Sequence, residues 1–148
     1  MTLEAASLPF PSDLHYLVEH DVWARLHGDG TATVGITALG IKLSGEIYMC
    51  RAKPIGSAVE QGRSVGVVEF AKAIVSVKSP LAGTVIACNP RLEDAPELVH
   101  RDPYGEGWIA RLAVRDFAAD APRLLHGADA AALADAMARH AASAGDER

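Results

Sequence analysis

Between residues 14 and 114 the chain is built of short apolar runs that are separated by turn residues such as Gly28, Pro80 and Asn89. Runs of this length, rich in β-branched residues and bounded by glycine, proline and asparagine, are typical of strands in an all-β sandwich or barrel. The strands predicted by this pattern are 22–26, 31–36, 46–50, 64–70, 74–78, 83–88 and 108–114.

Helical patterns are confined to short segments and to the C-terminal tail. The short helical turns are predicted at 38–43 and 96–100. Residues 129–142 are strong helix formers, and Asp129 can cap the start of this helix. Leu133, Met137 and Ala141 recur every four residues as a narrow apolar stripe, which predicts a helix that packs on the sheet.

These patterns divide the chain into four expected segments. We expect an N-terminal extension over residues 1–13 and a main β domain over 14–114. A helical segment packed on that domain should cover 115–143, followed by a tail over 144–148.

An internal repeat relates residues 43–50 to residues 81–88 at a constant offset of 38, matching leucine, glycine, a β-branched residue and cysteine. Such a repeat predicts two similar hairpin sets packed about a pseudo-two-fold axis. Cys50 and Cys88 end the two repeated strands, outside any C-x-x-C or zinc-ligand spacing. Both are therefore expected to be buried structural thiols.

Composition and charge exclude several classes of function. The 148 residues have a formal net charge of −5, and the basic residues are scattered, which argues against nucleic acid as a partner. No stretch approaches the ~18 consecutive apolar residues of a membrane span, and residues 1–10 lack a secretory signal pattern. We expect a cytoplasmic monomer that binds neither membrane nor nucleic acid. The absence of nucleophile, phosphate-loop and metal motifs argues against an enzyme.

Lysine is scarce, because the fourteen basic residues comprise ten arginines and only Lys42, Lys53, Lys72 and Lys78. Two β-rich runs, 65–70 and 74–77, are separated by Ala71, Lys72 and Ala73, so Lys72 is expected at or beside a hairpin tip. There its amine would project into water between methyl-sized neighbours, open to a modifying enzyme. The simpler alternative is an ordinary solvated loop lysine. Lys78 lies inside the second strand and is a poorer site.

Several motifs around this lysine resemble the H protein of the glycine cleavage system. Pro80 and Gly83 follow Lys72 by eight and eleven residues, the spacing of lipoyl domains and H proteins, and Glu69, Lys72 and Ala73 match the family's E-S-V-K-A. Further matches, to the family's opening segment and to its V-G-I-T, P-E-L-V, P-Y and G-W motifs, lie at 14–16, 20–21, 34–37, 96–99, 102–104 and 107–108.

The resemblance implies a lipoyl/biotinyl-type β-sandwich, also called a barrel-sandwich hybrid, with short helices and a C-terminal helix. It also implies lipoate in amide linkage to Lys72, within an acceptor motif that includes Glu69, Ala71 and Ala73. Such a protein is a carrier and not an enzyme, because its dithiol arm shuttles a bound intermediate between partner enzymes. A lipoate-attaching enzyme is a further implied partner. Among the six histidines, His20 is the one that the resemblance implies as a possible contact of the arm or its cargo.

Departures from the family pattern cluster near the acceptor. The family's acidic loop is basic here, with Arg51 and Lys53, which would reverse the steering of a charged partner. Ser76 stands where the family has an aspartate that helps to hold the amine of the aminomethyl cargo. Asp21 replaces the glutamate of the family's H-E-W, with Trp23 displaced by one position. His20, Asp21 and Ser76 are the expected contacts of the arm or its cargo.

Two pathways are compatible with this resemblance. The departures favour a carrier for a heterodisulfide-reductase-like sulfur-oxidation system, whose proteins would then be the partners. The alternative is the glycine cleavage role, in which an aminomethyl group passes from glycine decarboxylase to the aminomethyltransferase and dihydrolipoamide dehydrogenase reoxidises the arm. A biotinyl carrier or an unmodified adaptor is a third hypothesis. Biotin is disfavoured because Ala71 and Ala73 stand where biotin acceptors have methionine.

Overall fold

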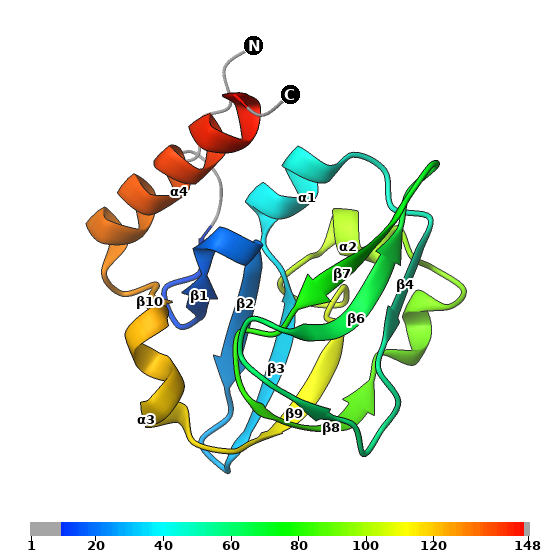
Figure 1. Ribbon diagram of the computed structural model, residues 1–148, viewed down its shortest axis with the longest axis horizontal. Coiled ribbons are helices and arrows are strands. Elements are labelled where there is room, and N and C mark those ends of the chain that lie inside the picture. Colours follow the sequence, from blue (N-terminus) through cyan, green and yellow to red (C-terminus); the bar gives the residue numbers. More distant parts are fainter. Residues whose placement is uncertain (1–9, 147–148) are drawn as a thin grey trace.

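Two antiparallel sheets form the body of the protein, for which a computed structural model describes residues 10–146. A seven-stranded sheet has the order β10-β1-β2-β3-β9-β8-β5, and a three-stranded sheet has the order β4-β6-β7 (Figure 1). The strands are β1 His15–Leu17, β2 Val22–Leu26, β3 Thr31–Ile36, β4 Met49–Ala52, β5 Ala58–Val59, β6 Ser64–Glu69, β7 Ile74–Lys78, β8 Gly83–Cys88, β9 Ala110–Val114 and β10 Leu125–His126. The expected mainly β sandwich is confirmed.

Short helices lie at the edges of the sheets, and one long helix ends the chain (Figure 1). The α-helices are α1 Ala38–Ser44, α2 Leu98–Arg101, α3 Phe117–Asp120 and α4 Ala130–Asp146, and the 3-10 helices are η2 Val18–His20, η3 Pro90–Leu92 and η4 Ala121–Arg123. None of the described helices is long and apolar enough to cross a membrane. Residues 1–9 of the expected N-terminal extension and residues 147–148 of the expected tail lie outside the described residues.

Four of the seven predicted strands have the predicted bounds; the strand predicted at 108–114 begins at Ala110, the one at 64–70 ends at Glu69, and the largest difference is at 46–50. The segment predicted at 46–50 begins later, as β4 at Met49. Gly45 has a positive φ of 86° after α1, and the Ile47 amide donates to Nε2 of His100 at 3.0 Å. The hydrogen bond of the Ile47 amide is therefore made with the His100 side chain and not with a neighbouring strand. The short strands β1, β5 and β10 escape prediction because two or three residues are too few to show an alternation.

The internal repeat is only partly reflected in the structure. Leu43 and Ser44 end α1, whereas the equivalent Leu81 and Ala82 lead directly into β8. Residues 45–48 also lie outside any strand, whereas the equivalent residues 83–86 belong to β8, so the repeat prediction is wrong except for residues 49–50. Both thiols are free, but Cys50 is buried in the three-stranded sheet and Cys88 is half-buried in the seven-stranded one. The expectation of a buried thiol is thus confirmed for Cys50 alone, and burial raises its pKa to about 12.

Helix α4 packs on the outside of the seven-stranded sheet, as the apolar stripe predicts. Leu133 and Met137 are buried with Leu14, Tyr16, Trp23 and Leu39, and Ala141 packs against the same cluster. The Asp129 carboxylate accepts a hydrogen bond from the Ala132 amide at 3.4 Å, so the predicted N-cap is confirmed. The helix is therefore part of the folded domain.

The apolar cluster beneath α4 is organised around the indole of Trp23. This side chain is fully buried, and its Nε1 donates to the carbonyl oxygens of Ile36 and Pro103, each at 3.1 Å. A Cβ at Gly35 would lie 2.6 Å from the indole Cζ2, so only glycine fits at this point of the V-G-I-T motif. Trp23 is accordingly a core residue, whatever its displacement relative to the H-E-W pattern.

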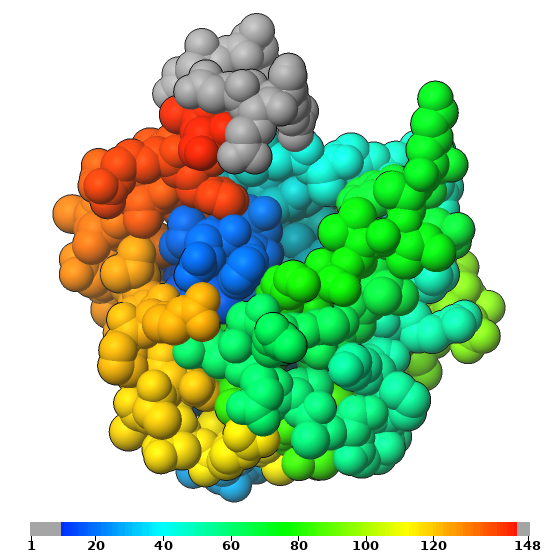
Figure 2. All heavy atoms as spheres, in the orientation of Figure 1, coloured from blue at the N-terminus to red at the C-terminus, as the bar shows by residue number. Residues whose placement is uncertain are grey.

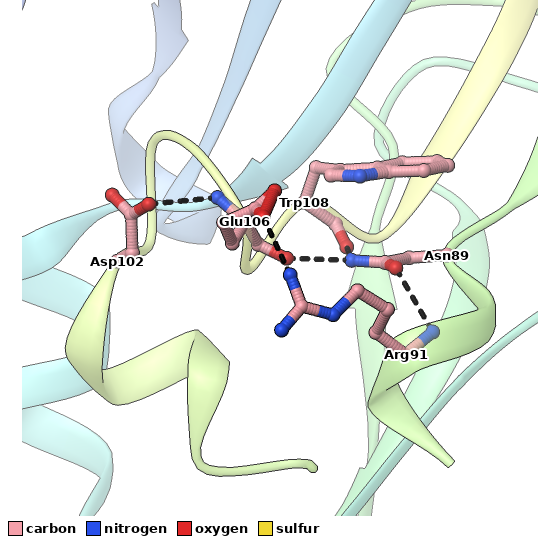
Figure 3. A network of polar contacts seen from close by, with 5 residues as sticks. All are labelled: Asn89, Arg91, Asp102, Glu106 and Trp108. Carbon is pink, nitrogen blue, oxygen red and sulfur yellow. Dashed lines mark hydrogen bonds and ion pairs between the residues drawn. The ribbon is translucent and has the colours of Figure 1, made fainter. Parts of the chain in front are cut away.

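A network of polar contacts joins the end of β8 to the loop before β9 (Figure 3). The Asn89 side-chain amide donates to the carbonyl oxygens of Glu106 and Trp108 at 2.7 and 2.8 Å, and its oxygen accepts from the Arg91 amide. The Asp102 carboxylate accepts from the Glu106 amide at 2.9 Å. The motifs at 102–104 and 107–108 therefore belong to a loop that these contacts fix in place.

Candidate functional site

The β6–β7 hairpin ends in a tip that stands clear of the body of the molecule (Figures 1 and 2). Strand pairing continues to Glu69 opposite Ile74, and the Phe70 amide then donates to the Ala73 carbonyl at 2.8 Å. The turn between them contains Ala71 and Lys72, both exposed. The predicted position of Lys72 at a hairpin tip is therefore confirmed.

Apolar side chains at the base of the hairpin are buried in the core, whereas those near its tip are exposed to solvent. Val68 and Val77 are buried in the core between the two sheets, and Phe70 packs partly against it. Nearer the tip, Ile74 and Val75 are 64% and 46% exposed. A firmly packed base thus supports an accessible end.

The environment of Lys72 fits an amide-linked group. Its neighbours Ala71 and Ala73 present only methyl groups and are themselves exposed. Within the described residues, no ion pair involves the Lys72 amine. Acylation of this amine would therefore break no ion pair and meet little steric obstruction.

Strand register places several predicted site residues on one face of the three-stranded sheet. Residues directly opposite one another in a sheet point to the same face. One row across the three strands is Met49, Glu69 and Ile74, and the next is Arg51, Val67 and Ser76. We call this surface the acceptor face, and Lys53 after β4 and Lys78 in β7 continue it by alternation. Its members are Met49, Arg51, Lys53, Ser64, Val67, Glu69, Ile74, Ser76 and Lys78.

The chemistry of the acceptor face differs from what a cationic cargo would need. Ser76 is exposed and offers a neutral hydroxyl, with Arg51 two strands away in the same row. Adjacent strands are about 4.8 Å apart, so their backbones lie about 10 Å from each other across the sheet. Glu69 is the one acidic side chain of the acceptor face, and it is half-buried. The acceptor face is therefore basic overall.

Asp21 has a different environment from the one predicted for a cargo contact. It ends η2 in a left-handed conformation with φ 62°, and its backbone carbonyl accepts from the Thr37 amide at 2.8 Å. Its carboxylate contacts Nε2 of His140 on α4 at 2.8 Å. Burial raises the pKa of Asp21, and the adjacent His140 opposes this increase. The carboxylate is thus already engaged within the chain.

His140 is the residue of this region that sequence reasoning missed. A helix that ends at residue 142, as the sequence predicts, would place His140 near the negative end of the helix dipole, whereas α4 continues to Asp146. The position of His140 seven residues after Leu133 and three after Met137 puts it on the buried face of α4, and this spacing was the available signal. His20, which precedes Asp21 in the chain, is half-buried at the end of η2.

Removal of the imidazole in His140→Ala should destabilise the protein by about 1–2 kcal/mol near neutral pH, because the half-buried Asp21 carboxylate loses a charge-assisted hydrogen bond. The pKa of Asp21 should also rise further, because the charge of His140 and its hydrogen bond to the carboxylate both lower that pKa. A raised pKa favours folding at low pH, so the loss of stability should grow as pH rises from about 4. Urea unfolding at several pH values and carboxyl NMR titration measure these effects.

The matched control for this prediction is Arg139→Ala, on the exposed side of the same helix. Arg139 pairs with Asp135 across one turn, and both side chains are more than two-thirds exposed. Its removal should change stability by at most ~0.5 kcal/mol. Equal effects of the two substitutions would show that the Asp21 contact does not hold α4.

Comparison with known proteins gives a consistent result. The family model described as glycine cleavage H-protein matches residues 14–137. Glycine cleavage system H protein 2 of Aquifex aeolicus is 38% identical over 139 residues, covering 93% of this chain and 86% of that protein. The glycine cleavage system H protein of Opitutus terrae is 42% identical over 119 residues, covering 80% and 92%.

A solved structure shows the same architecture. The crystal structure of a glycine cleavage system H protein from Mycobacterium marinum superposes with a TM-score of 0.68 at 27% sequence identity. The match covers 84% of this chain and 98% of that one. The match therefore includes nearly all of that protein.

Proposed function

The chain belongs to the glycine cleavage H-protein family, whose members are lipoyl carriers and not enzymes, and we propose that its lipoate is attached to Lys72. The observation that carries this proposal is the position of Lys72, an exposed amine that lies at the tip of a hairpin with a buried base and makes no ion pair within the described residues. The acceptor motif formed with Glu69, Ala71 and Ala73 supports it.

We further propose that the carrier serves glycine cleavage and transfers the aminomethyl group between glycine decarboxylase and the aminomethyltransferase. The relatives described above all have names from that system. The sulfur-oxidation role favoured by the sequence departures has no support among them, and neither do heterodisulfide-reductase-like partners. The glycine cleavage role is the better supported of the two.

The residues of this chain would act as a platform for the arm. The lipoyl group supplies a dithiol whose sulfur holds the cargo and is later reoxidised. The turn at Ala71 and Ala73 leaves the Lys72 stem free to move, while Phe70 and Val68 hold the base. His20, Asp21 and Ser76 remain predicted contacts of the arm or cargo, and Asp21 could make such a contact only by exchanging its bond to His140.

Turnover with the glycine cleavage enzymes tests the pathway. Lipoylated protein, supplied as the sole carrier to glycine decarboxylase, aminomethyltransferase and dihydrolipoamide dehydrogenase, should support continuous glycine oxidation. Unlipoylated protein at the same concentration is the control and should give background rates. Background rates from the lipoylated protein as well would contradict the glycine cleavage role while leaving the lipoyl attachment intact.

A further inference from the structure

We propose that the acceptor face docks an enzyme whose active-site entrance is rimmed by carboxylates. The proposal rests on the proposed function, because it names the kind of partner that receives the Lys72 arm. It concerns the outer surface of β4, β6 and β7, below the hairpin tip.

Unpaired positive charge is the first observation behind this proposal. Arg51 and Lys53 are exposed, Lys78 is half-buried, and no ion pair involves any of the three within the described residues. Elsewhere five arginines are paired with acids, as Arg25–Asp13, Arg91–Glu106, Arg115–Glu60, Arg123–Glu19 and Arg139–Asp135. Arg63, Arg101 and Arg111 also make no ion pair within the described residues, but they lie outside the acceptor face. The acceptor face therefore presents charge that the chain itself leaves available.

The sign of this charge is opposite to that of the whole protein. Three cations and Glu69 give the acceptor face a formal charge of +3 − 1 = +2, on a chain of net charge −5. Such an asymmetric distribution orients a protein as it approaches a charged partner and raises the rate of productive encounters. An acidic partner would be attracted to this face and repelled by the remainder of the surface.

Apolar side chains lie between the charges and the arm. Ile74 is 64% exposed beside Glu69, and Met49 completes the same row. Protein interfaces commonly combine an apolar centre with a polar rim. Because the row Met49, Glu69, Ile74 borders the turn that contains Lys72, an enzyme docked here would have the arm at the edge of its contact area.

A carboxylate-rimmed entrance fits this arrangement better than the other possible occupants. A second copy of this chain would bring a net negative body but also an identical basic face, so a symmetric contact between two such faces would be repulsive. Nucleic acid would require a broad basic surface, whereas the remainder of this chain is acidic.

Association kinetics test the proposal. The lipoylated full-length chain is mixed with each of the three glycine cleavage enzymes in stopped-flow experiments, at low and at physiological ionic strength. We expect the association rate constant with at least one enzyme to fall about tenfold as salt increases. The double substitution Arg51→Glu and Lys53→Glu should lower it about tenfold at low salt and change the dissociation rate much less.

The matched control reverses two exposed arginines that lie elsewhere, Arg101→Glu and Arg111→Glu, and so changes the net charge by the same amount. This control should associate nearly as fast as the unchanged protein. Equal rates for the two double variants, or rates insensitive to salt, would overturn the proposal. Salt-sensitive self-association or oligonucleotide binding through Arg51, with enzyme association unaffected, would overturn it too.

The mass of each variant separates this test from that of the proposed function. If no lipoyl group appears on the unchanged protein, the function fails before docking is tested. If all variants are lipoylated and circular dichroism shows the same fold, a missing charge effect refutes the docking surface alone.

Discussion

Replacement of Lys72 by arginine should abolish carrier activity while leaving the protein folded. Arginine keeps the positive charge and the length of the side chain, but its guanidinium cannot take the place of the amine in an amide to lipoate. Lys72 is exposed and makes no ion pair within the described residues, so its replacement should change stability by at most ~0.5 kcal/mol. Glycine oxidation by the reconstituted enzymes should fall to the rate measured without a carrier.

Lys78→Arg is the matched control for this experiment. Lys78 lies in the same hairpin, six residues further along the chain, and is half-buried within β7. Its replacement should leave both the lipoyl adduct and the turnover in place. Turnover that survives Lys72→Arg but disappears in Lys78→Arg would move the attachment site to the second strand.

Trp23→Ala should strongly destabilise the protein. The side chain is fully buried between β2 and α4, and its indole donates to two backbone carbonyl groups. Truncation of a buried tryptophan removes transfer free energy, leaves a cavity and costs about 3–5 kcal/mol. The midpoint of urea unfolding, monitored by far-UV circular dichroism, measures this loss.

An exposed aromatic residue provides the comparison for Trp23. Tyr48 is 53% exposed, so Tyr48→Ala should change stability by at most about 0.5 kcal/mol. If Trp23→Ala were equally mild in stability and yet blocked turnover, Trp23 would act on the arm and not in the core.

The acceptor hairpin could be predicted from sequence because its determinants are local. Two β-branched runs flank Ala71, Lys72 and Ala73, and the observed pairing of Glu69 with Ile74 leaves only a short turn between them. The stripe of Leu133 and Met137 is local in the same sense, because a helix repeats every 3.6 residues. In both places the spacing of the apolar side chains matches the period of the strand or helix that forms.

The parts that escaped prediction depend on residues distant in the chain. The contact between Asp21 and His140 joins side chains 119 positions apart, and it exists because α4 packs beside η2. The late start of β4 depends on His100, which satisfies the Ile47 amide from another element. Without an alignment or a structure, neither pairing leaves a pattern within a short window of sequence.

The reversal of charge around Arg51 and Lys53 is visible in the sequence, but its geometry is not. Register shows that Arg51, Val67 and Ser76 form one row, so that the departures at Arg51, Lys53 and Ser76 share one surface, whereas Asp21 lies against α4. The sequence reading linked these changes to a different pathway. The comparisons favour glycine cleavage, and a changed docking partner explains the same residues without a change of cargo.

The position of the lipoyl group tests the central claim most directly. Protein isolated from cells supplied with lipoate is measured by intact mass spectrometry and then digested for peptide mapping. We predict a mass increase of one lipoyl group, located on the peptide that contains Lys72. An unmodified mass, or a lipoyl group on Lys78, Lys53 or Lys42 instead, would contradict the account.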